Sequence, residues 1–154
     1  MRKIFFAVFS LLLIGGIIGY FYLVDSSSQY KPYGSEEAIK KGDIVFKDKV
    51  YNIKRFEQFL TNLANRKKDS IRITGYTDEG DPLFKDLRFD GKVILYSYDD
   101  SNDAFGGNNK GLKKDVCKEV LEKVSIQGEI NYIMSGCSKN SQDMSYFLIR
   151  VPKK

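Results

Sequence analysis

The chain has 154 residues, of which 25 are basic and 20 acidic, and it contains two cysteines and no histidine. All acidic residues and all but two basic ones follow residue 24, where Lys and Asp alternate instead of clustering, which argues against a nucleic-acid binder. The lack of histidine excludes the usual catalytic triads, and two cysteines are too few for a structural zinc site. We therefore predict no metal and no cofactor.

Residues 4–24 form an uncharged apolar segment that directly follows Arg2 and Lys3. At about 1.5 Å per residue, a helix of this length spans roughly 30 Å of hydrocarbon. We interpret residues 1–24 as a membrane anchor with a cytoplasmic N-terminus, because basic residues stay on the cytoplasmic side. A cleaved signal peptide is the alternative, although its apolar region is usually shorter and ends in small residues. No cysteine lies near the end of the segment, which excludes a lipoprotein anchor.

Residues 25–42 are polar, with one proline and two glycines, and we interpret them as a linker. Short strands are expected at residues 44–46 and 50–51. From Asn52 onward the apolar residues recur at helical spacing, which predicts a helix over residues 52–65 with Asn52 as its N-cap.

Ile71 and Ile73 alternate with Arg72 and Thr74, which predicts a strand with one buried face. Gly75 inside this strand indicates a bulge or a close backbone approach. Residues 77–82, with the sequence TDEGDP, predict a tight turn in which Gly80 takes a positive φ and Pro82 fixes the exit.

A hairpin follows, with its turn at Asp90 and Gly91. A three-residue loop with Gly91 as a bulge separates apolar from polar side chains better than a two-residue loop does. It would place four apolar residues on one face: Leu87, Phe89, Val93 and Leu95. The opposite face would then be unusually aromatic, with Asp86, Arg88, Ile94, Tyr96 and Tyr98.

Residues 99–111 are expected to form a flexible acidic loop. A second helix is predicted over residues 112–124, because its apolar residues follow helical spacing and would face the core: Leu112, Val116, Val120 and Leu121. Two strands, at residues 129–137 and 145–151, are expected to end the fold.

The order of these elements favours an α+β domain over residues 43–154, with a mostly antiparallel sheet of about five to six strands and two helices packed on one face. If the anchor holds this domain outside the cytoplasm, Cys117 and Cys137 can form a disulfide. The bridge would close a loop of about 21 residues and contribute roughly 3 kcal/mol. The alternative is two unrelated buried thiols.

The sequence GDIV at residues 42–45, the following amphipathic helix and the TDEGDP turn at residues 77–82 resemble a known family. This family is domain of unknown function 4362, which consists of small extracytoplasmic domains of bacillus-type Gram-positive bacteria. The resemblance covers about residues 42–150. It implies a location and a shape but no activity. Members are often lipoproteins, whereas this chain has an apolar segment instead.

The candidate binding residues belong to an aromatic and charged group around the turn: Tyr76, Thr77, Glu79, Asp81, Arg88 and Tyr96. Tyrosines beside arginines are typical of recognition surfaces. We therefore expect a membrane-tethered binding module at the cell surface, with a protein, a peptide or a wall polymer as its partner. The alternative is that the tyrosines are covered and belong to the core.

Two other functions use the same carboxylates. The side chains of residues 77–81, together with Asp99, Asp100 and Asp103, could bind calcium. Glu79 with Asp81 or Asp86 could form the acid and base of a hydrolase. The simpler interpretation is that these carboxylates satisfy backbone groups of turns and keep the loops solvated. We assign no catalytic residue.

Overall fold

The computed structural model describes residues 33–47, 49–139 and 146–152. The apolar segment at residues 4–24 and the first part of the expected linker lie outside this range. No helix within the described part of the chain is long and apolar enough to cross a membrane.

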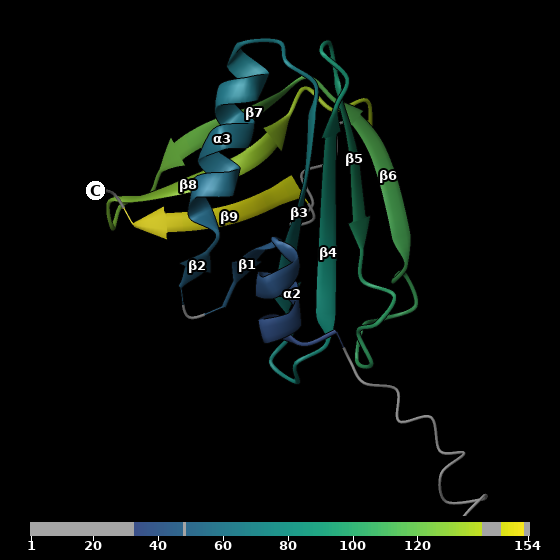
Figure 1. The fold of residues 1–154 in the computed structure, drawn as a ribbon. Helices are drawn as coiled ribbons and strands as arrows, with labels where there is room; N and C mark the ends of the chain where they lie inside the picture. The colour runs from purple at the N-terminus through teal and green to yellow at the C-terminus, as the bar shows by residue number, and fades with distance from the viewer. Residues whose placement is uncertain (1–32, 48, 140–145, 153–154) are drawn as a thin grey trace, which may run out of the picture. The chain divides into compact units, whose positions relative to one another are not determined.

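The larger of two sheets has six strands in the order β2-β1-β3-β4-β5-β6 (Figure 1). Its strands are β1 (Ile44–Phe46), β2 (Val50–Tyr51), β3 (Asp69–Tyr76), β4 (Pro82–Phe89), β5 (Ile94–Asp99) and β6 (Leu112–Cys117). β1 runs parallel to β3 and every other pair is antiparallel. The parallel pair requires a crossover connection, and helix α3 (Ile53–Ala64) lies within it. The prediction of a mostly antiparallel α+β fold is confirmed.

The smaller sheet contains β7 (Glu119–Val124), β8 (Glu129–Ser135) and β9 (Phe147–Pro152), all antiparallel. In Figure 1 these strands run across the direction of the long strands β3 and β4. β8 and β9 correspond to the two strands expected at the end of the chain.

The predicted helix over residues 112–124 is wrong, because this stretch forms β6 and β7. Lys118 separates the two strands. β6 pairs with β5 in the larger sheet, and β7 pairs with β8 in the smaller sheet. Alternation along β6 buries Asp115 and Cys117 and leaves Val116 41% exposed. Apolar residues spaced four apart fit one face of a helix. They fit two short strands equally well when each strand can pair with a neighbouring strand, as β6 does with β5 and β7 with β8.

The hairpin between β4 and β5 also differs from its prediction. Phe89 pairs with Ile94, so the loop has four residues, and Asp90 closes it by accepting hydrogen bonds from the amides of Lys92 and Val93. Gly91 has φ = +100°, as a residue in this turn requires. The extra residue reverses which side chains of β5 face the core. Ile94 and Tyr96 are buried with Leu87 and Phe89, whereas Leu95 is 40% exposed.

Two helices occur in the described part of the chain. α2 (Ser35–Lys41) lies in the stretch interpreted as linker and buries Ala38. α3 begins after Asn52 as predicted, but the Asn52 side chain makes no cap hydrogen bond. Asn52 instead adopts a left-handed conformation and its side-chain amide donates to the carbonyls of Ile39 and Asp43, which ties the start of α3 to the end of α2.

The core lies where α3, the large sheet and the small sheet meet. Phe56 and Phe59 of α3 are fully buried, and the Phe56 ring packs edge-on against Tyr132 of β8 with ring centroids 4.9 Å apart. α3 contacts β3 and β1, and α2 contacts β1. The packing of both helices on one face of the sheet stays a prediction.

Candidate functional site

A pocket of about 620 Å³ opens beside the turn that joins β3 to β4. We call it the turn pocket. Its apolar lining comes from β1, β3, β4 and β9: Phe46, Ile73, Leu83, Phe147 and Leu148. Small-molecule sites usually have volumes of about 300–1,000 Å³ and are lined mainly by apolar side chains with a few polar groups. The turn pocket has a volume in this range, and its apolar side chains are accompanied by several charged ones.

Lys85 provides a cation in this pocket. Strand alternation places Lys85 on the same face of β4 as the buried Leu87, and its amine donates a hydrogen bond of 2.5 Å to the carbonyl of Phe147. The amine also lies 5.7 Å from the Tyr98 ring centroid and 5.6 Å from that of Phe147. No carboxylate in the described part of the chain lies within 4 Å of it. Burial lowers the pKa of Lys85 to about 8, because the charged amine loses hydration.

Gly75 lines the pocket next to Leu83, its partner on β4. The predicted bulge is absent, because the pairing of β3 with β4 continues in register through Gly75 to Tyr76. The predicted close approach is absent too, since a Cβ atom at this position would have no heavy atom within 4 Å. Glycine in a strand costs stability and here neither packing nor a positive φ requires it. Its effect is to leave space in the pocket.

The acidic turn has a well-defined internal structure. The amide of Thr77 donates to the carbonyl of Asp81, and the Thr77 hydroxyl accepts from the Asp81 amide. Gly80 has φ = +95°, as predicted. The Asp81 carboxylate accepts a hydrogen bond of 2.8 Å from the amide of Ala104, so it holds the β5–β6 loop against the turn. Thr77 and Asp81 therefore shape the turn.

Asp78 and Glu79 differ from their neighbours in the turn. Both side chains line the turn pocket and are exposed. Neither makes a hydrogen bond or an ion pair within the described residues. These two carboxylates are consequently available to a bound ligand.

The structure divides the predicted binding residues among three places. Tyr76, Thr77 and Glu79 line the turn pocket, although the Tyr76 hydroxyl donates to the carbonyl of Tyr33. Burial, followed by the charges of Asp43 and Glu37, raises the pKa of Tyr76 to about 12. Asp81 holds the loop behind the turn.

Arg88 and Tyr96 lie away from the turn pocket. Arg88 is exposed on the opposite face of β4 from Lys85. Tyr96 is buried, with its ring 5.7 Å from that of Tyr146. The predicted surface of tyrosines beside arginines therefore does not form, because the four-residue hairpin loop turns Tyr96 and Tyr98 to the inner face.

Lys85 is absent from the sequence-based site, although the sequence contains a signal for it. It occupies an inward position in the alternation of Leu83, Lys85, Leu87 and Phe89 on β4. A lysine at such a position must place its charge inside or beside the core, which is costly without a partner. The alternation along β4 is enough to show this signal, whereas the contact of the Lys85 amine with Phe147 of β9 depends on the tertiary structure.

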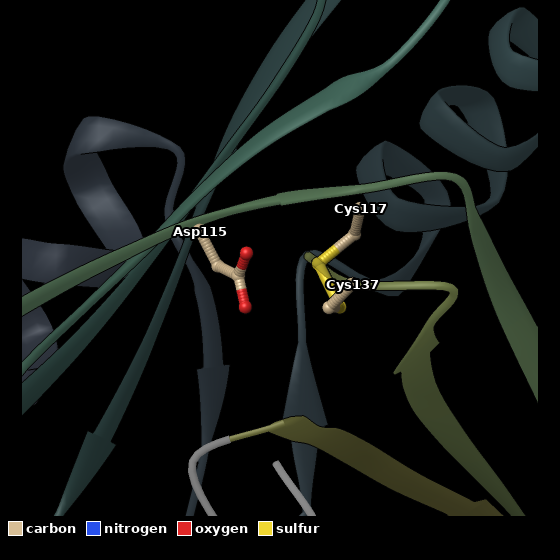
Figure 2. A group of neighbouring side chains, drawn as sticks. All are labelled: Asp115, Cys117 and Cys137. Carbon is tan, nitrogen blue, oxygen red and sulfur yellow. A yellow bond between two sulfur atoms is a disulfide. The ribbon is translucent and has the colours of Figure 1, made fainter. Parts of the chain in front are cut away.

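The neighbourhood of the disulfide is a second cluster (Figure 2). Cys117 and Cys137 are bridged, as predicted, and the Asp115 carboxylate lies beside them. These three residues are the only group of potential metal ligands close enough together in the described part of the chain. Because both sulfurs belong to the disulfide, the thiolates that a metal would need are not available.

Asp115 is 7% exposed and holds the segment that follows Cys137. Its carboxylate accepts hydrogen bonds from the Ser138 hydroxyl, the Tyr146 hydroxyl and the amides of Val116, Ser138 and Lys139. Burial alone would raise the pKa of Asp115, but these hydrogen bonds outweigh it and hold the pKa at about 2. Asp115 is thus a structural anion.

The arrangement of carboxylates favours neither calcium binding nor hydrolysis. At the end of β5 and in the loop that follows it, Asp99, Asp100 and Asp103 each accept a hydrogen bond from a backbone amide. Asp86 forms a salt bridge of 2.7 Å with Arg72 and lies on the opposite face of β4 from Lys85. Neither Asp81 nor Asp86, the two predicted partners of Glu79, is among the residues that line the turn pocket.

A comparison with protein families matches residues 41–132 to the Domain of unknown function (DUF4362), which is more than half of the chain. The chain belongs to this family. The DUF4362 region includes Gly75, Lys85 and the acidic turn, whereas Cys137 and Phe147 follow it. No match was found among curated proteins or among solved structures.

Proposed function

We propose that this chain is a binding module whose ligand occupies the turn pocket. The single observation that carries the proposal is Gly75, a strand glycine that lines the pocket at a position where a Cβ atom would meet no heavy atom within 4 Å. A larger residue at position 75 would have a higher strand propensity than glycine. Gly75 therefore lowers stability, and packing does not offset that loss. Space reserved for a ligand accounts for that cost.

The compartment is part of the same proposal. We propose that residues 4–24 anchor the chain and hold the α+β domain on the extracytoplasmic side of the cell membrane. The uncharged run of residues and the basic start support this orientation. The bridge between Cys117 and Cys137 also supports it, because disulfides persist in oxidising compartments. The ligand is then a peptide, a wall polymer or a surface protein.

Reporter fusions test this orientation. Alkaline phosphatase needs an oxidising compartment, so a fusion at the C-terminus of the full chain is expected to be active in cells. A β-galactosidase fusion at the same position is expected to be inactive, because that enzyme works in the cytoplasm. The reverse pattern of activities would contradict the proposed topology.

Filling the pocket tests the binding function. We expect Gly75→Leu to keep or raise the melting temperature, because the new side chain enters open space in a strand. We expect the same variant to weaken ligand binding at least tenfold. The measurement is ligand-observed NMR on the purified full chain in detergent, with a panel of short peptides, muropeptides and teichoic-acid fragments.

Gly107→Leu is the matched control for this experiment. A Cβ atom at Gly107 also meets no heavy atom within 4 Å, but Gly107 lies in the β5–β6 loop and does not line the turn pocket. Compounds that bind the wild-type chain should therefore bind Gly107→Leu equally well. Binding that is equal in Gly75→Leu and the wild type, or no binding by any compound, would contradict the proposed function.

A further inference from the structure

We propose that the turn pocket binds a short apolar peptide by both of its ends. The peptide's terminal carboxylate meets the Lys85 amine, and its terminal ammonium group meets Asp78 and Glu79. This inference rests on the proposed function and adds the chemical class of the ligand.

The first step of the argument is the incomplete coordination of Lys85. An ammonium group has three hydrogen-bond donors, and within the described residues the Lys85 amine has one acceptor, the Phe147 carbonyl. The two aromatic rings beside it offer weaker attraction than a carboxylate does. A largely buried cation is unfavourable without a counter-ion, and the described residues provide none for Lys85, so the carboxylate of a ligand would supply the opposite charge. The lowered pKa of Lys85 is consistent with this deficit.

The second step of the argument concerns the charged side chains that line the turn pocket. Asp78 and Glu79 line the pocket without partners in the described part of the chain, and Lys47 lines it as well. With Lys85, the pocket therefore contains two cations and two carboxylates. A phosphate or another polyanion would meet repulsion from the two carboxylates. A ligand with one negative and one positive end matches the charges better.

The third step of the argument concerns the length of the ligand and the apolar lining of the turn pocket. Ile73, the pairing partner of Lys85, lies four residues before Thr77. At about 3.3 Å per residue this separation is roughly 13 Å along the strand, which an extended peptide of about three or four residues spans. The lining of the same pocket also includes four apolar side chains: Phe46, Leu83, Phe147 and Leu148. They suit a peptide with apolar side chains.

The experiment compares three forms of one tripeptide, Leu-Ala-Leu, by calorimetric titration of the full chain in detergent. We expect the free peptide to bind, its C-terminal amide to bind at least tenfold more weakly and its N-acetyl form at least threefold more weakly. The smaller second effect follows from the exposure of Asp78 and Glu79. These comparisons on the wild-type chain require no variant to fold.

Variants then assign the ends of the peptide. Lys85→Met is expected to remove the difference between the free acid and the amide, and Glu79→Gln to reduce the difference between the free and acetylated amines. Lys113→Met is the control, because the Lys113 amine also lies over the Tyr98 ring, at 5.5 Å, yet Lys113 does not line the turn pocket. It should leave all three affinities unchanged.

Equal binding of the free acid and the amide by the wild-type chain would overturn the inference. So would an absence of peptide binding when another compound binds in a way that depends on Gly75. In that second case the turn pocket is a binding site for a different ligand, and the proposed function survives. If no compound binds in a way that depends on Gly75, the proposed function fails as well.

Discussion

Asp115→Asn is expected to lower the free energy of unfolding by about 3 kcal/mol at pH 7. The asparagine side chain has no negative charge and places an NH₂ group where one carboxylate oxygen accepted hydrogen bonds. Donors on Ser138, Lys139 and Tyr146 would then lose a charged acceptor inside the protein. Urea unfolding of the two chains measures the difference.

This difference should depend on pH in a defined direction. The pKa of Asp115 is about 2 in the folded chain and 3.8 in the unfolded chain. The unfolded state therefore binds the proton more readily. The stabilisation from the charge, about 2 kcal/mol, is complete above pH 4 and is lost as the pH falls towards 2. We therefore expect the advantage of the wild-type chain over Asp115→Asn to shrink by about 2 kcal/mol across that range.

Asp86→Asn is the matched control, because it makes the same chemical change at a carboxylate that is 44% exposed and paired with Arg72. Exposed ion pairs contribute about 0–1 kcal/mol, so the control should be close to wild type. Equal losses in the two variants would show that Asp115 has no special structural role.

Reducing the Cys117–Cys137 disulfide is expected to lower the free energy of unfolding by about 3 kcal/mol. The bridge joins the end of β6 in the large sheet to the segment that follows β8 in the small sheet. Its removal increases the conformational freedom of the unfolded chain. Unfolding in urea with and without reductant measures the loss, and alkylation before mass measurement reports how many thiols are free.

The Cys117→Ala and Cys137→Ala double variant is the control for this measurement. It should match the reduced wild-type chain in stability and show no further response to reductant. An oxidised sample in which both cysteines are freely alkylated would contradict the bridge. A reduced chain with unchanged stability would contradict the energetic contribution assigned to it.

Several features of the fold were predictable because they depend on residues close in the sequence. The period of apolar residues in α3 and the turn chemistry around Gly80 are local signals, and both are confirmed. Even there, the role of Asn52 differs from its prediction, since its side chain bonds to the carbonyls of Ile39 and Asp43 rather than to its own helix.

The hairpin between β4 and β5 shows how a small local error changes a predicted site. One additional loop residue reverses the faces of β5, because side chains alternate along a strand. Tyr96 then moves from an expected binding surface into the core. Lys85 shares a face of β4 with Leu87 and Phe89 in either hairpin, so its inward position was readable from the sequence, but the β9 residues that complete the pocket around it were not.

By itself, the sequence determined the α+β class, the position of α3, the acidic turn and the pairing of its only two cysteines. Only the tertiary structure decided that residues 112–124 divide between two sheets and that Lys85, Gly75 and the β9 residue Phe147 share a pocket. The physical reason is that strands obtain their hydrogen bonds from distant segments. The environment of each strand residue therefore depends on pairings that local periodicity does not specify.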